Sequence, residues 1–329
     1  MDSKGESAVP ASATVSSDQS LSIGTVTKAP PPGLLGYKTR EEFETATTGS
    51  GTTTYNGHYY ATSGQKVTNY GVLGTFSLYA PVATASSWSG IQIACGNSQT
   101  GQLQAVEAGF HVNRALYGDD KLHLYTYFTT TGYTREGQVG YLGGYNRAAG
   151  FTVSDGSGTS GHQPAYVPGM AIAQLSELGG EHVELELKWR LHGRNWWLEV
   201  NGSPVGYYHQ AFFEQAGANS LADFADAVAV WGEVYDPDNT PPITQMGSGR
   251  PAGYGKGYAA SVTDAYINTG DGVAQKYVGS VWATDPKLYS IDAHFDDPGI
   301  PGEGSTLFIG GPGRRDWSED AGKAADALD

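Results

Sequence analysis

Two glutamates, Glu107 and Glu233, are the residues of this chain best suited to acid–base chemistry. Two carboxylates held close together cannot both ionise, so such a pair holds a single proton over a range of acid pH. The ionised member can take a proton from water, while the protonated member polarises a carbonyl or protonates a leaving nitrogen. The pattern alone does not bring the two together, because a glutamate on the polar face of a strand is more often solvated.

Each glutamate lies in a segment with the period of a β-strand. In residues 103–112 the apolar side chains occupy the even positions, so Glu107 points to the opposite face. In residues 228–235 the valines mark the inward face, and Glu233 shares the other face with two aromatic residues. Aromatic neighbours desolvate a carboxylate, so we expect the pKa of Glu233 to be raised. These neighbours are Trp231 and Tyr235.

Several aromatic residues and one amide could line a substrate cleft next to the glutamates. Aromatic walls suit a proline ring, which offers a flat apolar face and no N–H group. A glutamine could donate a hydrogen bond to a developing oxyanion. The same aromatic residues could instead fill the core of a sandwich. The predicted substrate-contacting residues are Tyr125, Tyr127, Trp197, Trp231, Tyr235 and Gln245.

The elements that must position these residues are mostly short strands. With 47 Gly, 21 Tyr and only 16% charged residues, the composition favours strands and turns. Residues 122–128 and 183–191 alternate with period two, and residues 196–200 complete a hairpin with the second of these. A short helix is expected over 39–45, at a Thr-x-x-Glu capping box, and another over 210–226. The predicted fold is all-β, an antiparallel β-sandwich.

Composition divides the chain into three parts. Residues 1–50 are rich in Ser, Thr and Pro and are expected to be a largely irregular leader, a linker or the remnant of a pro-segment. Residues 51–317 form the predicted catalytic β-sandwich domain, and residues 318–329 form a polar tail. The N-terminus lacks the apolar core of a signal peptide, so the protein is either intracellular or a secreted protein whose signal was removed.

Charge and residue usage exclude several classes of function. The formal net charge of −15 disfavours nucleic acid as a partner, and no apolar run approaches the length of a membrane span. The eight histidines lack metal-ligand spacing, so no metal site is expected. A single cysteine, Cys95, allows no intrachain disulfide. The sequence does not indicate an oligomeric state.

A series of segments resembles the neprosin family of glutamic endopeptidases, in family order over about residues 55–315. The segments begin with Glu107-Ala108-Gly109-Phe110 and Gly118-Asp119, which leads to Leu124-Tyr125-Thr126-Tyr127. They continue with Asn195-Trp196-Trp197-Leu198, Val205-Gly206-Tyr207-Tyr208, Trp231-Gly232-Glu233-Val234, Thr244-Gln245-Met246-Gly247-Ser248-Gly249, Gly253-Tyr254-Gly255-Lys256 and Phe308-Ile309-Gly310-Gly311-Pro312-Gly313. Two departures are that Phe110 stands where the family has Trp, and that a family cysteine pair is missing.

The resemblance implies both a fold and an activity. It implies two stacked, curved antiparallel sheets, with the catalytic glutamates at Glu107 and Glu233. It further implies an N-terminal pro-segment, secretion, activity in acid, and cleavage of proline-rich peptides or proteins after proline. It implies no metal or organic cofactor.

Two other functions remain open from the residues alone. A glycoside hydrolase would also use two carboxylates and an aromatic-lined sandwich. A non-catalytic module that binds carbohydrate or peptide would use the aromatic residues but would leave the two glutamates far apart or solvated. A panel of polysaccharides tested beside protein substrates separates these possibilities.

Overall fold

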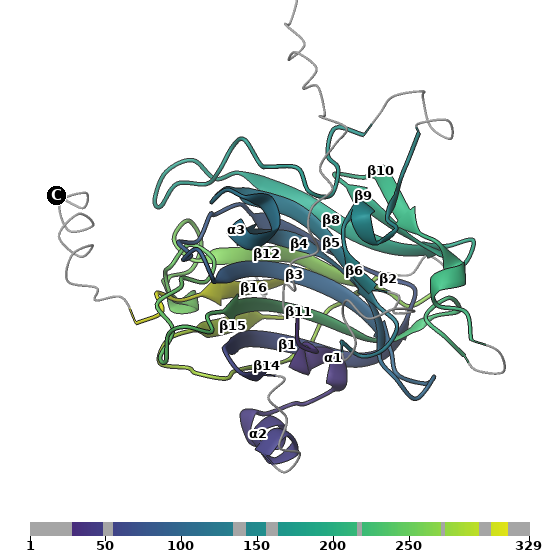
Figure 1. Cartoon of the computed structure of the whole chain (residues 1–329), viewed down its shortest axis with the longest axis horizontal. Helices are drawn as coiled ribbons and strands as arrows, with labels where there is room; N and C mark the ends of the chain where they lie inside the picture. Colours follow the sequence, from purple (N-terminus) through teal and green to yellow (C-terminus); the bar gives the residue numbers. More distant parts are fainter. Residues whose placement is uncertain are drawn as a thin grey trace, which may run out of the picture.

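The computed structural model describes residues 28–48, 55–133, 143–155, 164–215, 219–270, 274–295 and 304–314. Within these residues the chain forms two stacked, curved antiparallel sheets of seven and nine strands (Figure 1). The prediction of an antiparallel β-sandwich is therefore confirmed. Among the described helices, none is long and apolar enough to cross a membrane.

The seven-stranded sheet carries both candidate glutamates, on two strands that flank a third. Its order is β14, β1, β11, β3, β4, β5, β6, so that β3 separates the strands of Glu233 and Glu107. The strands are β1 (His58–Asn69), β3 (Trp88–Asn97), β4 (Gln104–Asn113), β5 (Leu122–Thr129), β6 (Gly143–Tyr145), β11 (Ala225–Tyr235) and β14 (Ser280–Ala283).

The nine-stranded sheet covers one face of the first. Its order is β15, β16, β12, β2, β8, β9, β10, β7, with β13 paired to β12. The strands are β2 (Gly71–Ser77), β7 (Thr152–Val153), β8 (Glu184–His192), β9 (Asn195–Val200), β10 (Ser203–Tyr208), β12 (Ala260–Asn268), β13 (Ala274–Lys276), β15 (Ser290–His294) and β16 (Ser305–Gly310). The predicted hairpin is present as β8 and β9.

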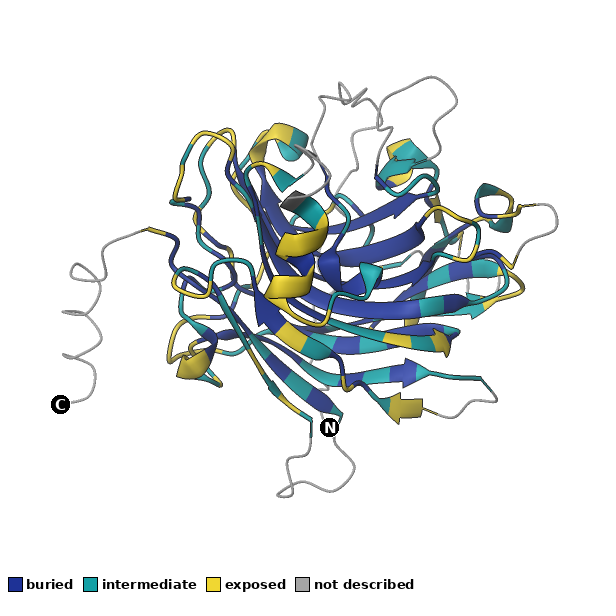
Figure 2. Ribbon diagram, turned by 90° about the horizontal axis from the view of Figure 1, so that it is seen from below, coloured by how far each residue is buried: buried dark blue, intermediate teal, exposed yellow. Residues whose placement is uncertain are grey.

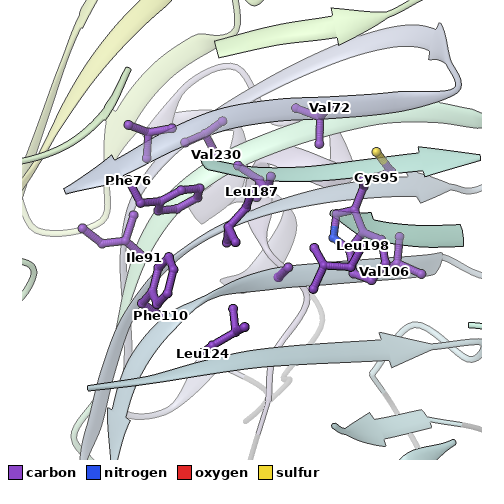
Figure 3. Close-up of a cluster of buried hydrophobic side chains, with 14 of the residues drawn as sticks. Val72, Phe76, Ile91, Cys95, Val106, Phe110, Leu124, Leu187, Leu198 and Val230 are labelled. Carbon is purple, nitrogen blue, oxygen red and sulfur yellow. The ribbon is translucent and has the colours of Figure 1, made fainter. Parts of the chain in front are cut away.

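The core lies between the two sheets. The apolar positions of the alternating strands meet there, including Ile91, Val106 and Phe110 from the first sheet and Leu187 and Leu198 from the second (Figure 3). The face of each sheet that contributes to this core is called its inner face below, and the other its outer face.

The helices are few and short. The expected helix over 39–45 is present as α2 (Arg40–Thr48), and its capping box forms because Glu42 N–H donates to Thr39 Oγ1 at 3.1 Å. The others are α1 (Pro32–Leu35) and α3 (Arg114–Tyr117). The expectation of a helix over 210–226 is wrong: a 3-10 turn occupies Gln210–Phe212, and β11 begins at Ala225.

The outer faces of the two sheets differ. Strands β3, β4 and β5 are buried at every position, whereas β8 alternates between buried and more exposed positions (Figure 2). Residues 28–36 account for part of this burial, because α1 packs on β1, β11 and β3. The contact is close enough that a Cβ at Gly64 would lie 2.3 Å from Gly33 O.

The predicted leader and tail fall only partly within the described residues. Residues 28–48 contain α1 and α2, and α2 docks through Phe43, whose ring centroid lies 5.3 Å from that of Trp282 in β14. Residues 1–27 and the predicted tail at 318–329 lie outside the described residues.

Candidate active site

The outer face of the seven-stranded sheet brings the two predicted glutamates toward one point. Along β3, Gly90 pairs with Glu233 of β11, and Ala94 pairs with Glu107 of β4. Gln92 lies midway between these positions of β3 and, by strand alternation, on the same face. Both glutamates are fully buried.

A lysine from the N-terminal segment joins the glutamates. The Nζ atom of Lys28 lies 2.8 Å from Glu107 Oε2 and 2.9 Å from Glu233 Oε2, and all three side chains are inaccessible to solvent. The same nitrogen lies 5.4 to 6.0 Å from the ring centroids of four aromatic residues, a range typical of cation–π contacts. These are Trp88, Tyr125, Tyr127 and Trp231.

Glu233 accepts hydrogen bonds on both carboxylate oxygens. Three donors reach Oε2: Lys28 Nζ at 2.9 Å, Gln92 Nε2 at 3.1 Å and Trp231 Nε1 at 3.3 Å. Two more reach Oε1: His58 Nδ1 at 2.9 Å and Tyr60 OH at 3.1 Å. A buried carboxylate with five donors is held in its ionised form.

Glu107 has fewer partners. The Tyr133 hydroxyl donates to its Oε1, and Lys28 contacts its Oε2. The ring of Tyr133 stacks on that of Tyr127 with centroids 5.6 Å apart, which fixes the hydroxyl toward the glutamate.

This asymmetry separates the two pKa values. Burial raises the pKa of Glu107 above its usual 4.5, and Lys28 and Tyr133 only partly oppose that effect. Burial acts on Glu233 in the same direction, but Lys28 and His58 outweigh it and lower the pKa of Glu233 to about 2. The expectation of a raised pKa at Glu233 is therefore wrong, because the aromatic neighbours come with hydrogen-bond donors. Glu107 is the member of the pair that holds a proton more readily.

Four of the predicted aromatic residues lie around this centre. Trp231 donates directly to Glu233, and Tyr125 and Tyr127 come within cation–π range of Lys28. Tyr235 lies one shell further out, with its ring centroid 4.5 Å from that of His58.

The structure places the other two predicted substrate-contacting residues elsewhere. Trp197 is on β9 of the nine-stranded sheet, where its ring packs on Tyr207 with centroids 4.6 Å apart. Its neighbour Trp196 points into the core, so Trp197, which pairs with Arg190, points to the outer face of that sheet. Trp197 therefore points away from the glutamates. Gln245 is in a loop, where its Oε1 accepts a hydrogen bond from Val82 N–H at 3.1 Å.

Sequence reasoning missed five residues that contact the glutamates. A signal was present for three of them, because alternation in β1 and β3 places these polar side chains opposite the apolar face. No local signal identifies the other two, which reach the site from a segment before β1 and from a turn after β5. The five residues are His58, Tyr60, Gln92, Lys28 and Tyr133.

Gly109 gives Gln92 its place between the glutamates. These residues pair across β3 and β4, and a Cβ at Gly109 would lie 2.6 Å from Gln92 Cβ and 2.2 Å from Ile91 O. We expect Gly109→Ala to lower the free energy of unfolding by about 1–3 kcal/mol through overpacking. Urea unfolding checks this against Gly253→Ala, where no atom lies within 4 Å of the added Cβ. Equal stability of the two variants would contradict the close packing.

No cluster of three or more His, Cys, Asp or Glu side chains suited to a metal ion occurs among the described residues. The groups at the site that can take part in acid–base chemistry are the two glutamates and the hydrogen-bond donors around them.

Solved structures and a family model are similar to this chain. The chain aligns with crystal structures of scytalido-glutamic peptidase bound to a peptide-based transition-state analogue (9% identity, TM-score 0.39) and of SCP-B, an eqolisin-family peptidase, bound to the tripeptide Ala-Ile-His (8% identity, TM-score 0.35). The alignments cover 76% of this chain in both cases, and 97% and 96% of the other chains. The comparison with curated proteins gives no match. The family model named Neprosin matches residues 85–312, which include both glutamates and more than half of the chain, and the chain therefore belongs to the neprosin family.

Proposed function

We propose that this protein is a glutamic endopeptidase that cleaves peptide bonds C-terminal to proline at acid pH, with Glu107 and Glu233 activating a water molecule. The observation that carries the proposal is the position of Lys28 Nζ, within 2.9 Å of an oxygen of each glutamate. In size and hydrogen-bond length an ammonium nitrogen stands in for a water molecule. A water at this position would lie within hydrogen-bond distance of both glutamates.

The surroundings assign different roles to the two glutamates. Glu233, with its lowered pKa, is the general base that takes a proton from the water. Glu107, with its raised pKa, is the general acid that polarises the scissile carbonyl and then protonates the leaving nitrogen. The reaction thus moves one proton from water to Glu233 and one from Glu107 to the amine.

This assignment sets two limits on the pH of activity. Glu233 is ionised above about pH 2, and Glu107 is protonated below its own pKa, which lies above 4.5. The pair is competent between these limits. Because the Lys28 ammonium lowers both pKa values, its departure moves this window toward higher pH.

The chain's own proline-rich segment supports the preference for proline. Residues 29–34 have the sequence Ala-Pro-Pro-Pro-Gly-Leu and lie against the outer face of the seven-stranded sheet, where Ala29 and Leu34 are fully buried. The cluster on this face includes larger residues such as Leu103 and Trp231, and also four alanines from three strands, which leave room for pyrrolidine rings. The alanines are Ala94, Ala105, Ala227 and Ala229.

The same segment holds the site in an inactive state. Lys28 occupies the water position and neutralises the charge of the pair, so a substrate can bind only after Lys28 leaves. We place the regulatory part of the chain at residues 28–48, consistent with a pro-segment within residues 1–50.

A cleavage assay tests the proposal. The full chain, with and without Lys28→Met, is incubated between about pH 2 and pH 7 with a peptide containing a single internal proline, and the products are identified by mass spectrometry. We expect cleavage after proline in acid and loss of cleavage as Glu107 deprotonates. A peptide in which alanine replaces the proline is the matched control for specificity. Cleavage of polysaccharides without cleavage of any peptide would overturn the proposal.

A further inference from the structure

Next to the glutamates, the outer face of the seven-stranded sheet carries a group of buried polar atoms without hydrogen-bond partners. The group lies on β1, β3, β4 and β5. It starts at the level between the two glutamates and extends past Glu233, away from residues 29–34. The atoms are His58 Nε2, Trp88 Nε1, Gln92 Oε1, His111 Nδ1 and Tyr125 OH. These five residues are called the Trp88 patch.

The register of the strands makes the patch continuous. Gln92 and Tyr125 both pair with Gly109 of β4, so they flank one position of that strand. Two residues further along β3 and β4, His111 pairs with Gly90, and the following pair places Trp88 beside Tyr235 of β11. Successive levels of a sheet face are roughly 6.5–7 Å apart. The orphaned atoms therefore follow the strand direction from the glutamates outward.

The rings of the patch contact one another, which fixes the positions of the polar atoms. The ring of His111 stacks on Tyr125 with centroids 4.0 Å apart, and Trp88 meets His111 edge-on at 6.4 Å. The opposite nitrogen of His111, Nε2, lies 2.8 Å from Tyr117 OH. Burial, together with the charges of Lys28 and His123, lowers the pKa of His111 well below its usual value, so the imidazole is neutral.

Such a group of atoms is unusual for a protein interior. A buried donor or acceptor without a partner costs about 1–3 kcal/mol, and most are satisfied in native proteins. On the side towards residues 29–34 the face carries more small side chains, Ala94, Ala227 and Ala229 among them, although Thr62 Oγ1 is also buried there without a partner. Atoms left unpaired next to a reaction centre find their partners in a ligand.

We propose that the Trp88 patch binds the main chain of an extended peptide on the side of the scissile bond opposite to that covered by residues 29–34. Trp88 Nε1 is a donor only, and Gln92 Oε1 is an acceptor only. An extended peptide presents both C=O and N–H groups at a repeat of about 6.5–7 Å, which matches the levels of the sheet. An anion is disfavoured by Gln92 Oε1 and the nearby carboxylates. This inference rests on the proposed function, because it takes the glutamates to mark the scissile bond.

The binding test removes single polar atoms and keeps the rings. Tyr125→Phe deletes only the hydroxyl, and Trp88→Phe deletes the indole N–H. Both are made in the full chain carrying Lys28→Ala, which removes the blocking cation, and Glu107→Gln, which keeps the peptide intact. Trp189→Phe is the matched control, because Trp189 Nε1 is equally buried and unpartnered but lies in the core between the sheets. Binding of a proline-containing peptide is measured by calorimetry at acid pH.

We expect Tyr125→Phe and Trp88→Phe each to raise the Kd of the peptide about three- to tenfold, the range of one neutral hydrogen bond. Trp189→Phe should leave the Kd unchanged. Two shorter peptides can be made, one from each side of the cleaved bond. The Kd of the one that occupies the Trp88 patch should still rise in these variants, and the Kd of the other should not. The melting temperature of Tyr125→Phe should not fall, because its hydroxyl has no partner to lose within the protein.

Three results would overturn the proposal. These are an unchanged Kd in both variants, an equal effect on both shorter peptides, or binding of a neutral oligosaccharide in place of the peptide. A fall in the melting temperature of Tyr125→Phe with an unchanged Kd would show that the hydroxyl is bonded internally. The binding test does not depend on catalysis. If the substitutions change the Kd as expected but the protein cleaves no peptide, the proposed function is wrong and the proposed binding site remains.

Discussion

Replacing Glu233 by glutamine is expected to lower kcat/KM by about 10²- to 10⁴-fold, the contribution of a positioned general base. The amide of glutamine takes no proton from water, so the step assigned to Glu233 is lost at every pH. Five donors now surround the carboxylate, and an amide NH₂ group would face at least one of them. We therefore expect this variant to be less stable as well as inactive.

Glu107→Gln is expected to change the pH profile as well as the rate. A neutral amide still polarises a carbonyl weakly but gives no proton to the leaving nitrogen. In the unsubstituted protein, kcat/KM falls as the pH rises through the raised pKa of Glu107. In Glu107→Gln this fall should vanish, leaving a low activity that depends on pH only through the ionisation of Glu233.

Glu199→Gln is the matched control for both substitutions. Glu199 is also a buried strand glutamate with cationic partners, Lys188 and Arg190, each at 3.0 Å. It lies on β9 of the other sheet, so its substitution should leave kcat/KM unchanged. If all three variants cleaved peptides equally well, Glu107 and Glu233 would have no catalytic role.

Replacing Lys28 by methionine is expected to raise peptidase activity about tenfold or more and to destabilise the folded chain at neutral pH. Methionine keeps the long apolar stem and removes the charge. Removing one partner of a buried ion pair costs about 3–5 kcal/mol, because the remaining charges stay buried and uncompensated. The free energy that binds the N-terminal segment to the site falls by a comparable amount. A tenfold increase in activity needs a fall of only about 1.4 kcal/mol.

The loss of stability should depend on pH in a defined direction. Burial lowers the pKa of Lys28, but the two glutamates outweigh this and raise it above 10.5, so the ammonium is charged throughout the acid and neutral range. In Lys28→Met, the buried charge of Glu107 is relieved as the pH falls and that carboxyl takes up a proton. The difference in unfolding free energy from the unsubstituted protein should therefore shrink between pH 7 and pH 4.

Lys66→Met provides the control for Lys28. Lys66 lies on β1 with its side chain 43% exposed, and its Nζ is 3.8 Å from Asp226 Oδ1. An exposed pair of this kind contributes little, so stability should change by less than about 1 kcal/mol and activity not at all. Equal behaviour of the two methionine variants would show that Lys28 does not restrain the site.

The strands were predictable because their inner faces are regular. Alternation around Val106 and Phe110 and along residues 183–191 identified the apolar face, and the structure places these positions in the core. The orientation of Glu107 and Glu233 followed from the same alternation. What alternation does not provide is the pairing order of the strands, so the convergence of the two glutamates depended on the family resemblance.

The failures have separate physical causes. Alanine, phenylalanine and glutamate suggested a helix over 210–226, but only the 3-10 turn Gln210–Phe212 forms there, and the strand β11 begins at Ala225. Trp197 was predicted to line the cleft but lies on the other sheet, because periodicity identifies the face of a strand and not its neighbours. Lys28 is 205 residues from Glu233 along the chain, and nothing near it in the sequence indicates that its charge is buried.

In the proposed inactive state, the covalent connection between α2 and β1 makes the N-terminal segment a tethered competitor. A tethered ligand acts at an effective concentration in the millimolar range, whatever the concentration of the protein. Dilution therefore does not free the site while the chain is whole. A single cut between Thr48 and His58 turns the same contacts into a bimolecular complex, which dissociates on dilution and reforms only slowly. Before such a cut, the inhibition does not depend on protein concentration. After it, the N-terminal segment dissociates from the site, and the loss of inhibition is irreversible in practice.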